Sequence, residues 1–511
     1  MRSLVSFLLL ALVASVRAIS SSGGNRLLVI LEDVAEKDGY TKFLDDLEGR
    51  GFDIVYETPK SEGLSLFHLG ERSYDHILLF PTKAKGLFTF PFLLSLVICL
   101  LLATLAVVFL ADHNHQTLTG LGPNLTPNIL LQFINAEGNI LLALSGSTPV
   151  PSSLVSVLLE FDIHLPSDRQ GLVVDHFNYD SASASEQHDV LLLPTPGPLR
   201  LGYKNFFGLR SSDVQDGQEG AKEGGKTTGV IAFPNGIGQT LGQGSLLTPI
   251  LRADSTSYSY SPREGSDAID GLFGSGLQLS LVSALQARNS ARFTVVGSAD
   301  MLSDKWFDAD VKKIGEKTST KTLNREFAKA VSGWTFGEIG VLRVNWVEHH
   351  LNEEGLGNAS NPKIYRIKND VTYSISLSEY SWDKYIPFTV PENDELQLEF
   401  SMLSPFHRLK LNPTISSEDS TTYSVSFKLP DQHGIFNFLV NYKRPFLSNV
   451  FEKNTVSVRH FAHDEWPRSF VISGAWPWIA GIGVTVTGWL AFCAVWLYSA
   501  PPAKGESKKK Q

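Results

Sequence analysis

A long apolar run near the carboxyl end constrains this chain more than any other feature. From Val471 to Ala500 no side chain carries a charge. A helix rises 1.5 Å per residue, so a run of this length crosses a hydrocarbon core about 30 Å thick. We therefore predict a transmembrane helix over residues 471–499. The alternative is a buried helix of a soluble domain.

Small residues within this run indicate a packing surface. Gly481, Gly483 and Gly488 expose backbone, and membrane helices approach one another closely at such positions. Trp and Tyr side chains stand toward the ends of the run or along it, as amphipathic rings do near membrane interfaces. We expect these three glycines to contact other helices in the bilayer.

The amino terminus is typical of a secretory signal peptide. Arg2 supplies the positive charge, Leu4 to Val13 forms a short apolar stretch, and Val16 and Ala18 are small enough for a cleavage site. We predict that residues 1–18 are removed. The body would then enter the secretory pathway.

The tail, residues 500–511, is basic. Lys508 and Lys509 occupy the fourth and third positions from the end, which matches a dilysine retrieval signal to the endoplasmic reticulum. Basic tails belong on the cytosolic side. Together with a cleaved signal this predicts a single-pass type I protein of the endoplasmic reticulum membrane, with the bulk of the chain in the lumen. The alternative is a general stop-transfer cluster.

A second apolar run, Leu87 to Ala111, contradicts that topology. If it crossed the membrane, Asp112 to Arg468 would be cytosolic and the lysine tail would be luminal. Removing residues 87–120 joins Gly86 to Leu121 in an ordinary loop. Our hypothesis is that 87–120 is a translated, unspliced intron. A genuine hairpin or a lipid-contacting insertion is the alternative.

Cysteine content and charge limit what the body can be. The chain has two cysteines, Cys99 and Cys493, and both lie in apolar runs. The luminal body is therefore no disulfide framework and needs a large hydrophobic core. The net charge of −9 argues against a nucleic-acid partner.

The first part of the body, residues 19–338, alternates strand and helix patterns. Short continuous apolar runs at Arg26–Asp33, Phe52–Tyr56 and Tyr74–Phe80 are typical of buried parallel strands, and Tyr40–Leu47 has helical spacing. This predicts an α/β doubly wound domain of the Rossmann or flavodoxin-like kind. Further strands are expected at Asn139–Leu144, His188–Leu193, Thr228–Phe233 and Ala291–Gly297, and helices from near Asn128 and at Ser152–Leu159, Leu277–Leu285 and Asn324–Trp334.

The second part, residues 339–465, consists of short alternating runs separated by turns. This pattern predicts an antiparallel, immunoglobulin-like β-sandwich without the antibody-type disulfide. Its strands are expected at Lys363–Ile367, Thr372–Leu377, Leu396–Phe400, Thr422–Leu429, Phe436–Tyr442 and Asn454–His460.

Few patterns point to chemistry, and each has an ordinary structural explanation. Asp308 and Asp310 have the spacing of a metal-binding pair in glycosyltransferases. His349-His350, near Glu348, Glu353 and Glu354, is a possible metal site, although neighbours on a strand point opposite ways. Two further patterns fit known motifs poorly, namely Gly236-Ile-Gly238 with Gly242 and Gly244 as a phosphate loop, and Ser145 as a nucleophile. We assign no catalytic, cofactor-binding or metal-binding residue from them.

Two sites match the pattern for N-linked glycosylation. They are Asn124-Leu-Thr126 and Asn358-Ala-Ser360. Pro127 follows the first and disfavours its modification. Glycosylation of Asn358 would establish that the β region is luminal.

Several stretches together resemble one family over nearly the whole chain. They are Arg26–Asp33, Asn128–Gly146, Asp175–Phe177, Thr248–Leu251, Ser255–Tyr258, Leu285–Arg292, Gly297–Asp300 with Ser303-Asp304, Gly340–Arg343 with His349-His350, Tyr423–Asp431, and Tyr442. The chain is similar to the 48-kDa subunit of oligosaccharyltransferase, in a fungal form. Residues 87–120 have no counterpart in the family pattern.

This resemblance implies a non-catalytic role. The family stabilises the complex that transfers oligosaccharide from dolichyl diphosphate to asparagine. Its expected partners are the multispanning catalytic subunit, the ribophorin II-like subunit and the defender-against-cell-death-like subunit, with glycan as a candidate ligand of the α/β domain. The resemblance implies no cofactor. The alternatives are a stand-alone luminal α/β enzyme acting on sugars, and a glycan or cargo receptor.

Overall fold

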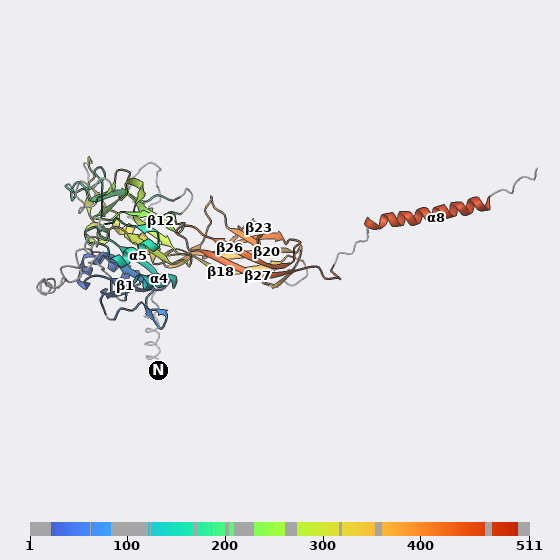
Figure 1. The fold of residues 1–511 in the computed structure, drawn as a ribbon, viewed down its shortest axis with the longest axis horizontal. Helices are drawn as coiled ribbons and strands as arrows, with labels where there is room; N and C mark the ends of the chain where they lie inside the picture. Colours follow the sequence, from blue (N-terminus) through green and yellow to red (C-terminus); the bar gives the residue numbers. More distant parts are fainter. Residues whose placement is uncertain are drawn as a thin grey trace, which may run out of the picture.

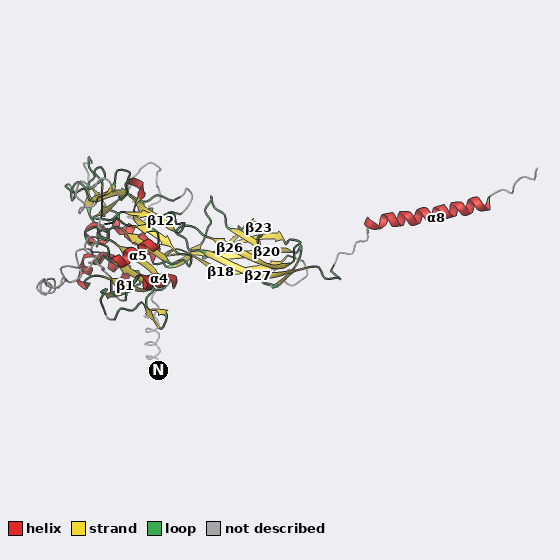
Figure 2. Cartoon of the chain, viewed as in Figure 1, coloured by secondary structure: helices red, strands yellow, loops and turns green. Residues whose placement is uncertain are grey.

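The computed structural model describes residues 22–82, 121–260, 273–315, 319–352, 360–465 and 473–498, apart from 62, 123, 168, 170, 185, 200–203 and 209–228 within those ranges. An α/β region comes first, a β region follows, and one apolar helix, α8 (Trp476–Leu497), comes last (Figure 1). Helices other than α8 lie in the α/β region, whereas the β region is built from strands (Figure 2).

A mixed nine-stranded sheet organises the α/β region. Its strands run in the order β2-β1-β5-β6-β15-β14-β11-β7, and β12 also pairs with β14. The first five strands are parallel, and the pairings beyond β15 are antiparallel. The strands are β1 (Arg26–Ile30), β2 (Asp53–Glu57), β5 (His76–Leu79), β6 (Asn139–Ala143), β7 (Ile163–His164), β11 (Gln239–Leu241), β12 (Leu247–Arg252), β14 (Leu279–Gln286) and β15 (Arg292–Val296).

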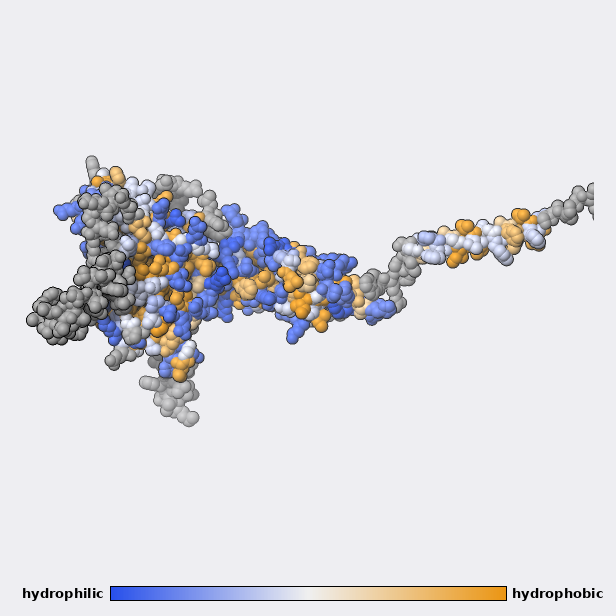
Figure 3. Space-filling model, in the orientation of Figure 1, coloured by the Kyte–Doolittle hydropathy of each residue, from blue (hydrophilic) through white to orange (hydrophobic). Residues whose placement is uncertain are grey.

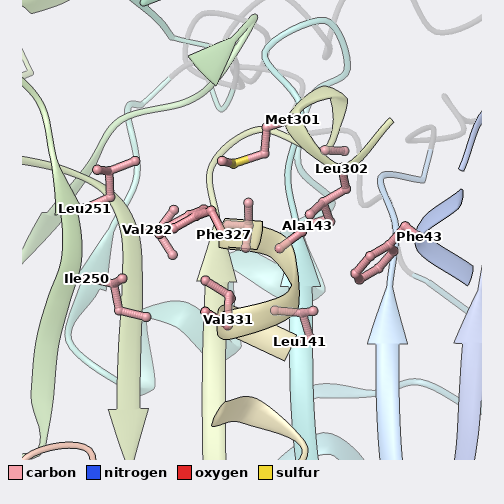
Figure 4. Packing of buried hydrophobic residues seen from close by; sticks show 14 of the residues in the cluster. Phe43, Leu141, Ala143, Ile250, Leu251, Val282, Met301, Leu302, Phe327 and Val331 are labelled. Carbon is pink, nitrogen blue, oxygen red and sulfur yellow. The ribbon is translucent and has the colours of Figure 1, made fainter. Parts of the chain in front are cut away.

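Helices cover both faces of this sheet because successive strand residues point to opposite sides. Leu27 and Val29 of β1 lie in a core with α2 (Thr41–Gly49) and α7 (Asn324–Thr335). Leu28 and Ile30 lie in a second core with α4 (Pro127–Asn135) and α5 (Ser152–Glu160). Figure 4 shows part of the first core, in which side chains of α7 lie over the strands.

Local signals set the helix starts. Thr126 caps α4, because its hydroxyl accepts the Ile129 amide at 3.4 Å, and Pro127 occupies the first turn. Helix α2 is capped from far along the chain. The Asp304 carboxylate accepts the backbone amides of Thr41 and Lys42 at 3.0 and 2.8 Å. The sequence near α2 gives no sign of that cap.

Most expected elements of this region are confirmed. The predicted strands at 26–33, 52–56, 74–80, 139–144, 188–193 and 291–297 correspond to β1, β2, β5, β6, β9 (Val190–Pro194) and β15, and the one at 228–233 corresponds to β10 (Val230–Pro234). The helices expected at 40–47, from 128, at 152–159 and at 324–334 correspond to α2, α4, α5 and α7.

The helix expected at Leu277–Leu285 is wrong. Those residues form a short 3-10 turn, Gly276–Gln278, and then strand β14. Every residue of β14 is buried, and the strand pairs with β15 and β11 along one edge and with β12 along the other. A strand buried on both faces has a continuous apolar sequence, which periodicity alone cannot distinguish from a buried helix.

Further short strand pairs of the α/β region lie outside the large sheet. β8 (Leu172–Val174) pairs with β13 (Tyr258–Tyr260), and β9 pairs with β10. Two further short pairs are β16 (Asp310–Val311) with β17 (Thr320–Lys321), and β3 (Phe67–His68) with β4 (Glu71–Arg72). These pairs position the loops of the candidate site below.

The β region consists of two five-stranded sheets with a shared core. One sheet contains β18 (Ile339–Leu351), β20 (Asp370–Ser381), β21 (Lys384–Pro387), β24 (Asn412–Ser416) and β25 (Thr421–Lys428). The other contains β19 (Ile364–Arg366), β22 (Gln397–Ser401), β23 (Pro405–Lys410), β26 (Gly434–Tyr442) and β27 (Val450–Arg459). The pairings are antiparallel except β19 with β27. The six strands predicted here are confirmed.

Buried polar contacts join the two regions. The Trp334 indole nitrogen in α7 donates to the Phe446 carbonyl at 2.9 Å, and the Asn449 amide donates to the Ser290 hydroxyl at 3.0 Å. Gln286 donates to the Leu447 carbonyl. The last helix of the α/β region and the 443–449 loop therefore share one interior.

Helix α8 corresponds to the predicted transmembrane helix. It is long and apolar enough to cross a membrane, and none of its residues is buried against the rest of the described structure. No other described helix meets those criteria.

Candidate functional site

A buried carboxylate shapes the loop between β8 and β9, residues 175–189. Asp175 accepts the backbone amides of Phe177 and Asn178 at 2.8 and 3.1 Å, and the hydroxyls of Thr256 and Ser257 at 2.7 and 2.9 Å. Burial alone would raise the pKa of Asp175, but these hydrogen bonds outweigh burial and hold the pKa below its usual value. The ionised carboxylate thus fixes the start of the loop.

The fixed loop presents rings to solvent. Phe177 is 65% exposed. His176 contacts the Tyr258 hydroxyl through Nε2 at 2.9 Å and Nδ1 of His188 through its own Nδ1 at 2.5 Å. His188 has a left-handed backbone, with φ of 53°, and its ring stacks on Tyr179 with centroids 3.9 Å apart. We call Phe177, His176, His188 and Tyr258 the ring surface.

The same loop also lines a polar pocket. Its volume is about 450 Å³. Asn235, just after β10, and Asp300, just after β15, meet there, with the Asn235 amide donating to the Asp300 carboxylate at 3.3 Å. Lys305 and Trp306 line another wall, and the Lys305 ammonium lies 5.1 Å from the Trp306 ring centre. The loop itself supplies Ser183, Ala184, Glu186, Gln187, Asp189 and the adjoining Val190.

This arrangement suits a ligand rich in hydroxyl groups. Carboxylates accept hydrogen bonds, and amides both donate and accept them. Aromatic rings offer apolar faces with polar edges nearby. The ring surface and the polar pocket supply these two kinds of contact, and one loop contributes to both.

The sequence analysis did not select these residues as a site. Asp175–Phe177, Ser255–Tyr258 and Gly297–Asp300 entered it as separate stretches of family resemblance. In the structure the first two meet at Asp175, and the third borders the polar pocket. The family resemblance of the three stretches was visible in the sequence. That they lie near one another became visible only in the tertiary structure.

The Asp308 and Asp310 pair has no metal-site arrangement. Asp308 is 2.5 Å from the Lys42 ammonium, and its pKa is lowered mainly by its hydrogen bond to Lys42. Asp310 belongs to the short strand β16. Among the described residues no group of three or more His, Cys, Asp or Glu side chains is placed to hold a metal ion.

The two histidines of β18 point to different environments, as expected of strand neighbours. His349 is buried, contacts the Tyr365 hydroxyl at 2.6 Å through Nδ1, and stacks on Phe438 at 4.9 Å. Burial lowers its pKa to about 4. His350 is partly exposed. His349 therefore packs the core, and Glu353 and Glu354 lie outside the described residues.

The glycines after β10 serve close packing. A side chain at Gly236 would begin 2.0 Å from the Phe233 ring, and one at Gly238 would begin 2.9 Å from Leu279 and Val173. Ser145 shares a 2.8 Å hydrogen bond with the Ser147 hydroxyl. These contacts give both motifs a structural explanation.

The remaining expected site residues fall into two groups. The side-chain amide of Asn124 donates to the Ser61 carbonyl at 3.4 Å. A Cβ atom added at Gly481, Gly483 or Gly488 would have no neighbouring atom of the described residues within 4 Å. Asn358, Lys508 and Lys509 lie outside the described residues, as do residues 1–18, residues 87–120 and Cys99.

Comparison with known proteins gives two family matches. The model of the OST48 N-terminal domain matches residues 18–89 and 107–338, which leaves 90–106 unmatched. The model of the OST48 middle domain matches residues 349–500.

Individual relatives match over nearly their full length. The Schizosaccharomyces pombe dolichyl-diphosphooligosaccharide–protein glycosyltransferase subunit wbp1 is 30% identical over 93% of this chain and 94% of its own. The 48 kDa subunit of the same glycosyltransferase from Danio rerio is 30% identical over 95% of this chain and 94% of its own. The Caenorhabditis elegans 48 kDa subunit is 29% identical over 98% of each chain.

Proposed function

Because the chain belongs to the OST48 family, we propose that it is a structural, non-catalytic subunit of the oligosaccharyltransferase of the endoplasmic reticulum. That complex transfers a preassembled oligosaccharide from dolichyl diphosphate to asparagine in Asn-X-Ser/Thr. The observation that carries the proposal is the match along almost the whole chain to relatives named as subunits of this glycosyltransferase.

The geometry supports a scaffold role. Two large regions share a buried junction, and α8 stands free of both, so its whole surface is available to other membrane helices. One helix cannot enclose a membrane-embedded active site by itself. The sequence motifs that suggested chemistry instead have packing or ion-pair partners.

Affinity purification from native membranes tests the proposal. A tagged chain, extracted in mild detergent, should recover the catalytic multispanning subunit, the ribophorin II-like subunit and the defender-against-cell-death-like subunit in near-equal amounts. Depleting the chain should reduce glycosylation of reporter proteins. Recovery of the chain alone, together with sugar-processing activity of its isolated luminal body, would instead support a stand-alone enzyme. An unrelated single-span protein with the same tag serves as the control.

The division of the chain is part of the same proposal. Residues 1–18 form a signal peptide, 19–338 and 339–465 two luminal domains, 471–499 the membrane span and 500–511 a cytosolic tail whose Lys508 and Lys509 direct retrieval. The first luminal domain is a doubly wound variant and the second an immunoglobulin-like sandwich. The parallel half of the first sheet and the facing sheets of the second support these assignments.

Protease treatment of intact microsomes tests this orientation. The region around Asn358 should be protected and carry N-glycan, whereas a tag after Gln511 should be removed. Digestion near Asn358 before membrane permeabilisation would contradict the type I topology.

The segment 87–120 remains proposed as a translated intron. The family match omits residues 90–106 but includes 87–89 and 107–120, so it supports an insertion at this place with narrower bounds than 87–120. Peptide mass spectrometry of the native protein should find a peptide joining Gly86 to Leu121. A peptide from within 87–120 would refute the hypothesis.

Glycan is the proposed ligand of the ring surface and the polar pocket. Replacing Phe177 by Ala should raise the KM for lipid-linked oligosaccharide about two- to tenfold, since an aromatic contact contributes roughly 0.5–1.5 kcal/mol. Phe451, 58% exposed in the β region, is the matched control for Phe→Ala. Equal KM values of the complex with either variant would show that Phe177 does not contact glycan. The assignment of the chain as a subunit would stand.

A further inference from the structure

The β region has two distinct ends. One end meets the α/β region, where the Trp382 amide donates to the Glu338 carbonyl at 2.7 Å. At the other end Gly434 of β26 pairs with Val458 of β27, Arg366 of β19 pairs with Arg459, and Asp370 of β20 pairs with Lys428. We call this second end the distal end. The chain leaves it through residues 459–465 toward α8.

The turn between β22 and β23 lies at the distal end, beside the first residues of β26. Ser401 of β22 lies opposite Asn437 of β26 and pairs with Pro405 of β23, so residues 402–404 lie level with residues 434–436. The Met402 sulfur would lie 2.8 Å from a side chain placed at Gly434, which puts the hairpin beside the start of β26.

Apolar side chains gather on this hairpin and its neighbour. Leu403, at the turn, is 99% exposed, and Ile435 of β26 is 63% exposed. Phe406 is also exposed and contacts the core ring of Phe436 at 5.3 Å between centroids. Figure 3 shows hydrophobic side chains at the end of the β region from which the chain leaves toward α8. We call Met402, Leu403, Phe406 and Ile435 the apolar tip.

Chain length brings the distal end close to the bilayer. Eight peptide steps separate Glu465 from Ser473, the first residue of the turn before α8. Fully extended chain spans at most about 3.6 Å per residue, so the reach is at most about 29 Å. Because α8 is the proposed membrane span, this short connection keeps the distal end near the bilayer.

Charges of both signs stand at the distal end. Lys368 lies 3.2 Å from Asp431, and Arg459 lies 2.7 Å from Glu465. Lys428 pairs with Asp370 across neighbouring strands. His433 and His460 contact each other with ring centroids 4.0 Å apart. Basic and acidic side chains are therefore mixed at this end, and its exposed apolar feature is the apolar tip.

We propose that the apolar tip inserts into the interfacial layer of the bilayer beside α8, through the fully exposed Leu403. Interfacial apolar groups enter the boundary between headgroups and acyl chains by roughly 5–10 Å. A few exposed apolar side chains on one turn and its neighbouring strand fit that layer, whereas a protein partner requires a broader complementary surface. Insertion at this second point would hold the luminal regions at a fixed tilt above the membrane. The inference depends on α8 spanning the bilayer, as proposed above.

Site-directed fluorescence in the intact complex tests this inference. Leu403→Cys is introduced after Cys99 and Cys493 are replaced by serine, and an environment-sensitive dye is attached. The complex is placed in phosphatidylcholine nanodiscs. Nitroxide-bearing phosphatidylcholine then reports lipid contact, and aqueous iodide reports exposure to water. Leu403 is almost fully exposed, so its substitution should leave the fold unchanged.

Two control positions make the result decisive. Ile415, 67% exposed on edge strand β24 of the same region, is replaced by cysteine as the matched aliphatic control. Native Cys493 in α8, labelled in a chain in which Cys99 alone is replaced by serine, reports membrane insertion of the helix. We expect the lipid nitroxide to quench most of the emission at 403 and 493, and iodide to quench most of it at 415.

Other outcomes overturn the inference. Quenching at 403 by iodide alone, with 493 still quenched by lipid, would place the tip in water while α8 spans. Resistance at 403 to both quenchers would mean that another subunit covers the tip. Absence of lipid quenching at 493 would contradict the proposal that α8 spans the bilayer, on which the inference depends.

Discussion

The guanidinium carbon of Arg292 lies 4.8 Å from the centre of the Trp334 indole ring. The same guanidinium donates to the Trp334 carbonyl at the end of α7, and to the carbonyls of Ile339 and Gly340 at 2.7 Å each. Trp334 in turn donates to the Phe446 carbonyl. This pair therefore ties the α/β region to the first residues of β18. Burial lowers the pKa of Arg292 to about 9, so the side chain stays charged at neutral pH.

Replacing Arg292 by Met should destabilise the junction strongly. The change leaves three buried carbonyls without a donor, at a cost of about 1–3 kcal/mol for each unsatisfied group. We expect the unfolding temperature of the purified chain to fall by several degrees and protease cleavage near 336–340 to accelerate. Arg252→Met, at an exposed position in β12, is the matched control and should change little. An unfolding temperature of Arg292→Met equal to that of the wild type would show that the hydrogen bonds of Arg292 contribute no stability.

Asp304 and Asp308 should differ although both contact the start of α2. Asp304→Ala removes the cap from Thr41 and Lys42 and should destabilise the α/β region by about 1–2 kcal/mol. Asp308→Ala removes an exposed ion pair with Lys42 and should have a small effect on stability. Chemical denaturation of the two variants measures this difference. Loss of oligosaccharide transfer in Asp308→Ala at unchanged stability would revive the metal-pair hypothesis.

His76 should make stability sensitive to acid. The buried ring contacts the Gly24 carbonyl at 2.9 Å and the Asn139 amide at 3.2 Å, and burial lowers its pKa to about 4. An unfolded histidine takes up its proton near pH 6.5, whereas the folded one resists protonation down to about pH 4. Its contribution to stability is therefore complete above about pH 6.5 and declines as the pH falls toward 4.

Unfolding temperatures measured between pH 7 and pH 4 test whether stability falls with falling pH because of His76. His76→Gln should reduce stability at pH 7 and flatten the decline in acid. His68→Gln, at an exposed position in β3, should keep the wild-type pH profile. A profile of His76→Gln parallel to the wild type would mean that another group causes the acid sensitivity.

The three glycines of α8 do not share one face. Seven residues separate Gly481 from Gly488, and such positions differ by only about 20° around a helix. Gly483 lies about 200° from Gly481, close to the opposite side. Double replacement of Gly481 and Gly488 by Leu should therefore block one packing face, and Gly483→Leu the other.

Subunit recovery in mild detergent reports which face is used. We expect at least one of these variants to co-purify less of the other membrane subunits than the wild type. Val484→Leu, which enlarges an already exposed aliphatic residue, is the control. Full recovery from both glycine variants would show that α8 docks without these positions.

Local sequence determined much of the backbone. A continuous apolar run predicted β1, a helix was expected from near Asn128 where α4 lies, and helical spacing predicted α7. The uncharged run near the end predicted α8. These elements follow from side-chain periodicity and from caps within a few residues of each helix, so the sequence alone suffices for them.

Other features depend on distant partners, and the sequence could not provide them. The run at 277–286 forms a strand because β15, β11 and β12 surround it. Arg292 is buried only because carbonyls from α7 and β18 surround its guanidinium. Asp175 orders its loop through hydroxyls some eighty positions away.

The amino-acid sequence by itself predicted many of the longer elements, the apolar helix near the end and the resemblance to a family. Tertiary structure alone decided which loops share a surface, which charges are buried, and which end of the β region carries an exposed apolar hairpin. The physical reason is the distance along the chain over which each kind of interaction acts. Periodicity and capping act between residues close along the chain, whereas burial, hydrogen-bond partners and exposure depend on segments that folding brings together.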